Sequence, residues 1–437
     1  MFCGDILIRD KGKEISMELI TKAPRGTSDV LPKECAKWQY IEEIVRKTTK
    51  AFNYKEIKFP TFEHTELFER GVGQETDVVQ KEMYTFLDKS NRSITLRPEG
   101  TAGAVRLMLE NGLYGGVLPL KYYYLISCFR YEKPQAGRLR EFHQFGVELF
   151  GSCEPQADAE VISLANEFLN NLKLKNIILQ INSIGCKDCR EKYINVLKKY
   201  FEQNKANLCE TCLNRLNKNP MRILDCKIKQ CGVVSKKAPV GLDYICQECN
   251  AHFEAVKQNL TAMNISFEIN EKIVRGLDYY NRTVFEFISN EIGAQGTVCG
   301  GGRYDGLAYE LAKENISGLG FAIGLERIIL LMTAQDNQFK NSDLCDVFVA
   351  NIGDMGSIEA VKLVNALRKK MICAEYDILG RSLKAQMKYA DKISAKYTLV
   401  LGENEINEKK AQLKNMQTGE KTTINIENIT EIIKMLR

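Results

Sequence analysis

The sequence predicts an α+β protein with a cysteine-rich helical insertion and a separate α/β domain at its C-terminal end. Three observations lead to this fold class. Residues 128–151 read as two strands joined by a loop, residues 186–263 combine charged helical patterns with paired cysteines, and residues 344–437 alternate strands with helices. With 437 residues, of which 44% are hydrophobic and 27% charged, the chain can form two or three domains.

Composition also narrows the location of the protein. No run approaches the roughly 18 to 20 apolar residues of a membrane span, and the first residues lack the apolar core of a signal peptide. We therefore expect a cytoplasmic protein without membrane contact. Residues 1–16 differ from the rest and are expected to be a disordered tail or a mis-assigned start. The net charge of +5 permits contact with a nucleic acid but does not argue for it.

The first elements are a helix and an interrupted strand. Apolar residues recur at helical spacing from Glu34 to Ala51. Residues 55–63 look like a strand that Pro60 interrupts, which suits a sheet edge or an interface. The next strand ends in TLRPEGT, where Thr101 is a plausible N-cap for the following helix.

The strand–loop–strand segment at 128–151 carries the first candidate site. Its loop is basic, and one face of its second strand offers Phe142, Gln144 and Glu148. Arginine at the base of such a hairpin can hold a phosphate by bidentate hydrogen bonds, and this face can stack a base and grip a polar ligand. The alternative is an ordinary hairpin with a solvated, charged loop.

The second half of the chain continues with a helix at 155–172 and a strand at 175–183, before the insertion. After it, the sequence predicts a strand at 266–269, the segment RGLDYYNRTVFEF, and a glycine-rich turn, GTVCGGGRYDGLA. GLGFAIGLERIILLM then reads as a strand that passes into a helix. The last domain has two strand–helix steps, a third strand that leads to a hairpin, and a final helix.

Five segments in a fixed order give the chain a resemblance to the bacterial-type histidyl-tRNA synthetases, which are class II aminoacyl-tRNA synthetases. They are the Pro60 strand with its helix (motif 1), TLRPEGT, the 128–151 hairpin (motif 2), RGLDYYNRTVFEF and GLGFAIGLER (motif 3). The resemblance covers residues 17–437. It implies an antiparallel sheet flanked by helices, a C-terminal α/β anticodon-binding domain and a homodimer formed through motif 1.

The resemblance also implies an activity. An enzyme of this family joins L-histidine to the 3′ end of histidine tRNA through histidyl-adenylate, using ATP with Mg²⁺, for translation. The alternative is a non-catalytic, synthetase-like regulatory subunit of histidine biosynthesis. Those paralogues typically lack the C-terminal domain and parts of RGLDYY and motif 3, whereas this chain keeps Arg275, Tyr280 and Arg327.

Roles for individual residues follow from the same resemblance. The implied catalytic residues are Arg130, Arg275 and Arg327, and the implied ATP-binding residues are Arg130, Glu132, Phe142, Arg275 and Arg327, with the adenine between Phe142 and Arg327. The implied histidine-binding residues are Glu99, Gly100, Thr101, Arg130, Gln144, Glu148, Arg275, Tyr279, Tyr280 and Tyr304. Contacts to tRNA are implied for Lys133, Gln135 and Arg138. For each arginine, the alternative role is a surface ion pair.

Neighbouring strand residues face opposite ways, so we expect at most one of Tyr279 and Tyr280 to point into the pocket.

The sequence predicts five parts of the chain. They are the extension 1–16, the catalytic domain in two parts, 17–185 with motifs 1 and 2 and 264–335 with the histidine-specific motif and motif 3, the cysteine-rich insertion 186–263 and the anticodon-binding domain 344–437.

The insertion contains three CxxC pairs, Cys186/Cys189, Cys209/Cys212 and Cys246/Cys249, and a looser fourth pair, Cys226/Cys231. A CxxC pair supplies two thiolates at the spacing that tetrahedral zinc requires, and two pairs complete a site. Structural Zn²⁺ is therefore one interpretation. The other is that these cysteines act as small hydrophobic residues of a helical module. The sequence does not decide which pairs would share an ion.

Overall fold

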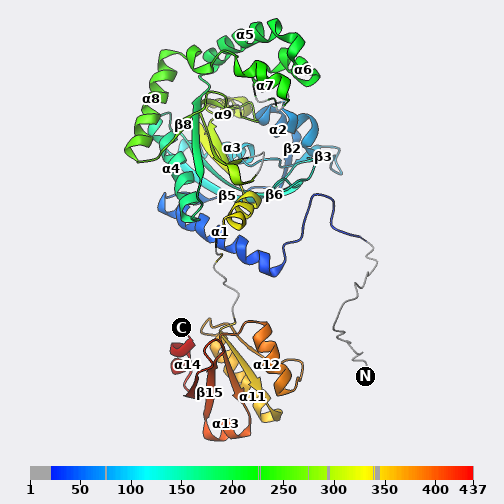
Figure 1. The fold of residues 1–437 in the computed structure, drawn as a ribbon, viewed down its shortest axis with the longest axis vertical. Helices are drawn as coiled ribbons and strands as arrows, with labels where there is room; N and C mark the ends of the chain where they lie inside the picture. Colours follow the sequence, from blue (N-terminus) through cyan, green and yellow to red (C-terminus); the bar gives the residue numbers. More distant parts are fainter. Residues whose placement is uncertain are drawn as a thin grey trace. The chain divides into compact units, whose positions relative to one another are not determined.

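The computed structural model describes residues 21–73, 76–224, 226, 228–273, 275–292, 296–337, 339 and 345–436. The prediction for residues 1–16 lies outside this range. The chain forms two compact units, one ending at Gln338 and the other beginning at Phe339 (Figure 1). Within the described residues, no helix combines the length and the apolar character needed to cross a membrane.

The first unit is built on a sheet that has eight strands among the described residues, in the order β1-β5-β6-β11-β10-β9-β7-β8. Neighbours inside the sheet are antiparallel, whereas the edge strands β1 and β8 pair in parallel. This arrangement confirms the predicted α+β fold with an antiparallel sheet. The strands are β1 (Lys55–Glu56), β5 (Leu120–Phe129), β6 (Glu141–Phe150), β7 (Ile177–Ser183), β8 (Glu268–Ile269), β9 (Asn281–Ser289), β10 (Thr297–Arg303) and β11 (Gly318–Gly324).

Helix α4 packs on one face of this sheet, and alternation along β6 explains why. Phe145, Val147 and Leu149 point to the same face and are buried, and the ring of Phe145 meets Phe168 of α4 at 5.0 Å. Phe142, Gln144, Gly146 and Glu148 alternate with them and face the opposite side of the sheet. The helices of this unit, apart from the insertion, are α1 (Pro32–Ala51), α2 (Thr65–Val72), α3 (Thr101–Glu110), α4 (Pro155–Asn171), α9 (Leu307–Ala312) and α10 (Leu325–Ala334).

One predicted element is wrong. The glycine-rich segment was expected to be a turn, but Thr297–Arg303 forms strand β10 in the middle of the sheet, between β9 and β11. A side chain at Gly300 would overlap the guanidinium of Arg275, which lies over the strand. The glycines therefore provide room above a central strand.

A small second sheet, with the order β2-β4-β3, follows α1 in the sequence. Its strands are β2 (Phe62–His64), β3 (Tyr84–Leu87) and β4 (Ser93–Leu96). Pro60 lies between β1 and β2, so the predicted interruption of this strand is confirmed.

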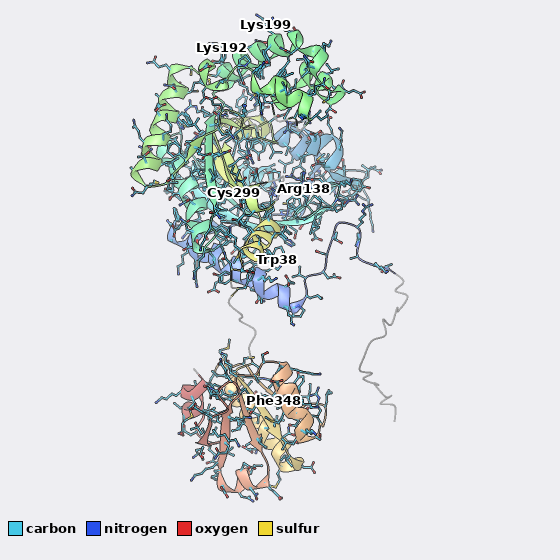
Figure 2. The ribbon with its side chains drawn as sticks, in the orientation of Figure 1. Trp38, Arg138, Lys192, Lys199, Cys299 and Phe348 are labelled. Atoms are coloured by element: carbon cyan, nitrogen blue, oxygen red, sulfur yellow. The ribbon has the colours of Figure 1, made fainter. Side chains whose placement is uncertain are left out.

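The insertion consists of α5 (Lys187–Gln203), α6 (Glu210–Lys218), α7 (Lys229–Lys236) and α8 (Gln247–Ala262). Figure 1 shows α5, α6 and α7 gathered at one end of the unit, opposite α1. They enclose a core of their own that includes Leu197, Phe201 and Ile223. Lys192 and Lys199 are exposed on the outer side of α5 (Figure 2). Helix α8 packs against α4 and leads the chain back to β8.

The second unit is an α/β domain with the strand order β13-β12-β14-β15-β16. Phe348 is completely buried in it (Figure 2). The first three strands in the order are parallel, and the last two form the predicted hairpin. Its elements are β12 (Val347–Asn351), α11 (Gly353–Arg368), β13 (Ala374–Tyr376), α12 (Leu383–Lys392), β14 (Tyr397–Leu401), α13 (Glu403–Glu408), β15 (Lys410–Asn415), β16 (Lys421–Asn425) and α14 (Ile429–Leu436).

Candidate active site

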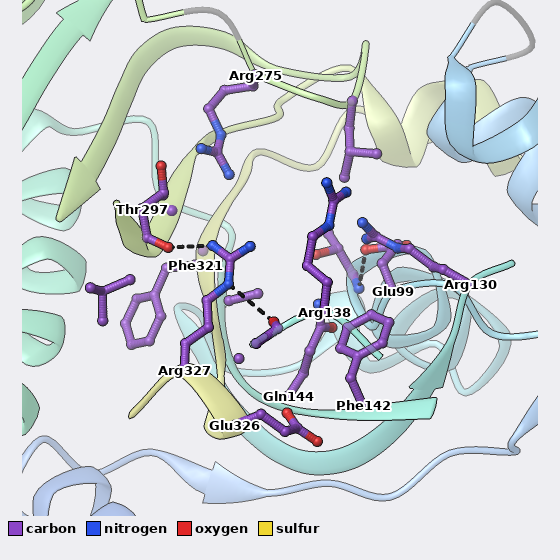
Figure 3. A pocket seen from close by; sticks show the side chains of 18 of the residues that line it. Glu99, Arg130, Arg138, Phe142, Gln144, Arg275, Thr297, Phe321, Glu326 and Arg327 are labelled. Carbon is purple, nitrogen blue, oxygen red and sulfur yellow. Dashed lines mark hydrogen bonds between the residues drawn. The ribbon is translucent and has the colours of Figure 1, made fainter. Parts of the chain in front are cut away.

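A pocket lies on the face of the large sheet that α4 does not cover (Figure 3). Its walls come from the loop after β4, the hairpin β5–β6, residues 275–280, β10, β11 and the start of α10. Twelve of the predicted site residues line it: Glu99, Thr101, Arg130, Glu132, Arg138, Phe142, Gln144, Arg275, Tyr279, Tyr280, Tyr304 and Arg327. Segments far apart in the sequence therefore meet at one cavity.

Arg130 stands where β5 passes into the loop of the hairpin. Its backbone N–H donates to the carbonyl oxygen of Arg140 at 2.8 Å, which closes the base of the loop. Its Nε donates to the carbonyl oxygen of Pro98 at 2.8 Å, and its guanidinium carbon lies 5.3 Å from the ring centroid of Phe142. These contacts direct the guanidinium into the pocket and leave it able to receive an anion.

Arg275 enters from the opposite wall, above β10 (Figure 3). It forms an ion pair with Glu286 of β9, and its guanidinium carbon lies 5.5 Å from the ring centroid of Tyr280. Glu286 also accepts a hydrogen bond from the hydroxyl of Thr297 at 3.1 Å. This ion pair anchors the Arg275 side chain to strand β9 of the sheet.

Arg327 lies in the first turn of α10 and donates to the carbonyl oxygen of Thr297 at 2.5 Å and to that of Gly137 at 3.5 Å. Arg138 forms an ion pair with Glu132 and is drawn between Arg327 and Phe142 in Figure 3. Burial, followed by the charge of Arg138, lowers the pKa of Arg327. Positive charge is thus concentrated in a pocket open to an anion.

Glu148 does not line the pocket, but it is fully buried next to it. Its carboxylate accepts a hydrogen bond from the hydroxyl of Tyr124 at 2.9 Å and another from the hydroxyl of Tyr304, which does line the pocket. Burial raises the pKa of Glu148 to about 8, although these hydrogen bonds act against the shift. A side chain at Gly146 would overlap the ring of Tyr124.

Glu99 performs the capping role that the sequence assigned to Thr101. Helix α3 begins at Thr101 itself, and the Glu99 carboxylate accepts the backbone N–H groups of Thr101 and Ala102 at 2.7 and 2.8 Å. The predicted N-cap role of Thr101 is therefore wrong, because Thr101 is the first residue of α3 and the side chain of Glu99 binds the free N–H groups at its start. Burial raises the pKa of Glu99, opposed by these two hydrogen bonds and by the charge of Arg130.

The expectation that at most one of Tyr279 and Tyr280 reaches the pocket is also wrong. Both tyrosines line it, with their ring centroids 4.7 Å apart. Residues 275–280 do not form a strand, because β9 begins only at Asn281. The alternation of a strand therefore does not apply to this segment, and a bend can turn two neighbouring side chains to one side.

The remaining predicted residues are divided between the loop tip and the start of α3. Lys133 and Gln135 are exposed at the tip of the hairpin loop, where a large partner could reach them. Arg138 is instead turned into the pocket. Gly100 precedes α3 and is buried, but it does not line the cavity.

Three contributing residues were not singled out from the sequence. Glu286 pairs with Arg275, the Thr297 carbonyl oxygen receives Arg327, and Glu326 accepts the backbone N–H of His143 at 2.9 Å and pairs with its ring. A polar residue within the apolar strand VFEFI was a usable signal for Glu286. A backbone carbonyl leaves no such signal.

The pocket presents guanidinium groups from three walls beside an aromatic ring and an amide, and the buried Glu148 behind it accepts a hydrogen bond from the hydroxyl of Tyr304. Such a site suits a ligand that carries several phosphates and a planar base, together with a small molecule bearing polar groups. Chemistry at a phosphorus atom gains most here from positioning and fixed positive charge.

Comparisons with known proteins agree with these features. A family model described as histidyl-tRNA synthetase matches residues 26–328, and one described as anticodon binding domain matches residues 346–436. A histidine–tRNA ligase of Acetivibrio thermocellus is 52% identical over 417 residues, which cover 95% of this chain and 100% of the relative. The corresponding ligase of Clostridium novyi is 51% identical, covering 95% of this chain and 99% of the relative. The crystal structure of apo S. aureus histidyl-tRNA synthetase matches with a TM-score of 0.82 and 39% identity, over 95% of this chain and 100% of that chain.

The pKa of Glu148 generates a prediction for stability. The pKa of this carboxyl is 4.5 when unperturbed and about 8 in the folded chain, so between pH 4.5 and about 8 the folded state holds a proton that the unfolded state has lost. The stability that this proton provides is fully present below pH 4.5 and is lost as the pH rises through about 8. Relative to the wild type, Glu148→Gln should therefore gain stability with rising pH. Thermal denaturation midpoints of both proteins across this range measure the effect.

Glu310→Gln, at an exposed position in α9, serves as the control and should follow the wild type at every pH. A difference between wild type and Glu148→Gln that does not change with pH would contradict the prediction.

Proposed function

Because the chain belongs to the histidyl-tRNA synthetase family, we infer that its pocket carries out the two steps of tRNA histidylation. The chain is an ATP-dependent histidine–tRNA ligase that attaches L-histidine to the 3′ end of histidine tRNA through histidyl-adenylate, for translation. The regulatory alternative is not favoured, since the relatives that match nearly the whole chain are ligases. The single observation that supports the assignment of the pocket is the meeting of Arg130, Arg275 and Arg327 at one cavity.

In the first step, a carboxylate oxygen of histidine attacks the α-phosphorus of ATP, and the bond from that phosphorus to the bridging oxygen of pyrophosphate breaks. Charge grows on the α-phosphate oxygens, so fixed cations lower the barrier. We assign this role to Arg130 and Arg275, which approach from opposite walls. Arg327 and Phe142 hold the adenine, with Glu132 beside it. Since Arg138 pairs with Glu132 inside the pocket, we assign it to the nucleotide rather than to the tRNA.

Histidine is selected by the polar groups at the other end of the pocket. We propose that Glu99, Thr101 and Gln144 hold the α-amino end, and that Tyr279, Tyr280 and Tyr304 surround the imidazole. Glu148 acts through the hydroxyl of Tyr304, to which it is bonded. An apolar analogue would leave these buried polar groups unpaired, which costs far more than a missing methylene group.

Mg²⁺ accompanies ATP in class II synthetases, where it neutralises phosphate charge. Two carboxylates that line or border this pocket, Glu132 and Glu286, are already paired with arginines. No group of three possible metal ligands lies in the pocket among the described residues. We therefore propose that the phosphates of ATP provide most of the Mg²⁺ ligands. Structural zinc in the insertion would take no part in either step, because no cysteine is among the described residues lining the pocket.

In the second step, a ribose hydroxyl of the terminal adenosine attacks the acyl carbon, and AMP leaves. We propose that Lys133 and Gln135, exposed at the tip of the hairpin loop, contact the acceptor end of the tRNA. The C-terminal α/β unit matches an anticodon-binding domain, and we assign it the opposite end of the tRNA. Phosphate contacts there would set the affinity, and contacts to base edges the identity.

We also propose a homodimer formed through motif 1. Its strand β1 is a sheet edge, and Phe62, Phe86 and Leu87 of the neighbouring small sheet are exposed by 56%, 48% and 64%. Exposed apolar side chains and an open strand edge are both typical of an interface.

We propose that the domains are residues 17–185, 186–263, 264–335 and 344–437. We also propose a cytoplasmic location, because tRNA is charged for translation there.

Arg275→Ala should abolish histidine-dependent exchange of pyrophosphate into ATP, because one of the cations on the α-phosphate is lost. Binding of histidine and of tRNA, measured separately, should remain largely in place. The control is Arg92→Ala, which removes an exposed arginine that pairs with Asp88 and should leave exchange unchanged. Near-normal exchange by Arg275→Ala would remove this arginine from the mechanism.

Tyr304→Phe should raise the KM for histidine on the order of tenfold or more, because the buried Glu148 loses a hydrogen-bond donor. The KM for ATP should stay constant, since the phenol lies at the histidine end of the proposed site. Exchange kinetics with each substrate varied in turn measure both constants. Tyr309→Phe, at an exposed tyrosine of α9, is the matched control. Equal rises in both KM values would argue against a histidine-specific role for Tyr304.

Analytical ultracentrifugation of the full chain should give the mass of two 49.7 kDa chains. The double variant Phe62→Glu/Phe86→Glu should sediment as a monomer, because it places charges on the apolar surface of the small sheet. Ile378→Glu replaces an apolar residue of the second unit that is even more exposed, at 76%, and this variant should remain dimeric. A double variant that is still dimeric would place the interface elsewhere.

A further inference from the structure

The eight cysteines of the insertion gather into two groups of four. Among the residues that the structure describes, the groups are Cys186, Cys189, Cys246 and Cys249, and Cys209, Cys212, Cys226 and Cys231. The sulfur atoms of each group all lie within 4.8 Å of one another. Four thiolates bound to one zinc ion at about 2.3 Å are roughly 3.8 Å apart. The separations of 3.5 Å for Cys186–Cys189 and 4.0 Å for Cys209–Cys226 lie on either side of this value.

Backbone N–H groups support the sulfur atoms in both groups. The N–H of Cys186 donates to Sγ of Cys249 at 3.2 Å, and the N–H of Cys246 donates to Sγ of Cys189 at 3.0 Å. These two bonds join the pairs of the first group reciprocally. In the second group, the N–H of Cys209 donates to Sγ of Cys231 at 3.1 Å. Hydrogen bonds of this kind stabilise the negative charge of a thiolate.

We propose that each group binds one structural Zn²⁺ ion through four thiolates. Four thiolates fill all the positions of a tetrahedral ion, so each site is closed, with no position left for a substrate. Disulfides do not explain the groups, because all eight cysteines are free and a bonded pair of sulfur atoms would be only about 2 Å apart. An iron–sulfur cluster spreads its thiolates over several iron atoms and needs them farther apart.

The second site lies inside the core of the insertion. Cys212 and Cys231 are completely buried and belong to the same apolar cluster as Leu197 and Phe201. This cluster is small, because the insertion that surrounds it spans only residues 186–263. Domains of this size bury too little apolar surface for much stability and are often completed by a metal ion.

The first site joins the beginning of the insertion to its end. Cys186 and Cys189 stand at the start of α5, directly after β7, and Cys246 and Cys249 stand at the start of α8. The bond from Cys246 to Cys189 spans 57 positions of the sequence. A metal ion at this point closes a long loop and therefore removes much conformational freedom from the unfolded chain.

The insertion also holds the segment 275–280, which lines the active site. Next to Cys189, Arg190 donates to the carbonyl oxygen of Asp278 at 2.8 Å. Arg222 donates to the carbonyl oxygen of Gly276 at 2.8 Å, and Asn219 donates to the Asp278 carboxylate at 3.0 Å. Loss of zinc should therefore disturb Arg275 and Tyr280 while Arg130 and Arg327 stay in place. This consequence for catalysis, unlike the zinc sites themselves, rests on the proposed function.

The experiment is a metal analysis of the full chain, purified from zinc-supplemented medium without chelators. The wild type should contain two zinc ions per chain, and mercurial modification of the thiols should release both into a chromogenic zinc indicator. Cys189→Ser and Cys231→Ser should each lower the content to one. Cys153→Ser, at an exposed cysteine outside both groups, is the matched control and should keep two.

A wild-type chain without zinc, or one that holds iron instead, would overturn the proposal. Since the wild-type measurement requires no variant to fold, a misfolded serine variant would leave this test intact. Removal of zinc should lower the thermal denaturation midpoint and raise the KM for histidine more than the KM for ATP. If the zinc-loaded chain catalysed no histidine-dependent exchange, the proposed function would fail while the zinc sites stood.

Discussion

Three positively charged groups must be held in one partly buried cavity before any anion is present, and the catalytic unit is arranged around this requirement. Like charges repel strongly where water is scarce. Each guanidinium is therefore fixed from a different element: Arg130 by the carbonyl oxygen of Pro98, Arg275 by Glu286, and Arg327 by the carbonyl oxygen of Thr297. Two of these partners are backbone carbonyl groups, which fix a guanidinium without neutralising its charge. Such a pocket is prepared for a polyphosphate and needs little rearrangement to bind it.

The same requirement explains the composition of the sheet beneath the pocket. Large side chains can lie flat over a strand only where the strand itself has none. Gly300 leaves room for Arg275, and Gly320 leaves room for the carboxylate of Glu148. These glycines weaken the intrinsic preference for a strand, which is why the sequence favours a turn at 296–308. The neighbouring strands β9 and β11 override that preference by pairing with β10 on both sides.

Much of the fold and of the site could be predicted, because motif order and hydrophobic periodicity are properties of the sequence. The hairpin at 128–151, the interrupted strand at Pro60 and the alternation of the last domain all follow from local patterns. Other features depend on where the chain travels in space. Tyr279 and Tyr280 both line the pocket because the chain bends there, and Cys189 and Cys246 come together because α8 returns to the start of α5.

The path of the insertion has a further physical consequence. A segment without regular secondary structure, such as 275–280, has no ladder of its own to fix it, so its position depends on partners outside the sheet. Arg190 and Arg222 provide those partners by binding its carbonyl oxygens. Both arginines belong to a module whose own core is small, so the rigidity that they transmit is limited by the stability of that module. The geometry around Arg275 is therefore set as much by the cysteine-rich helices as by the sheet on which it lies.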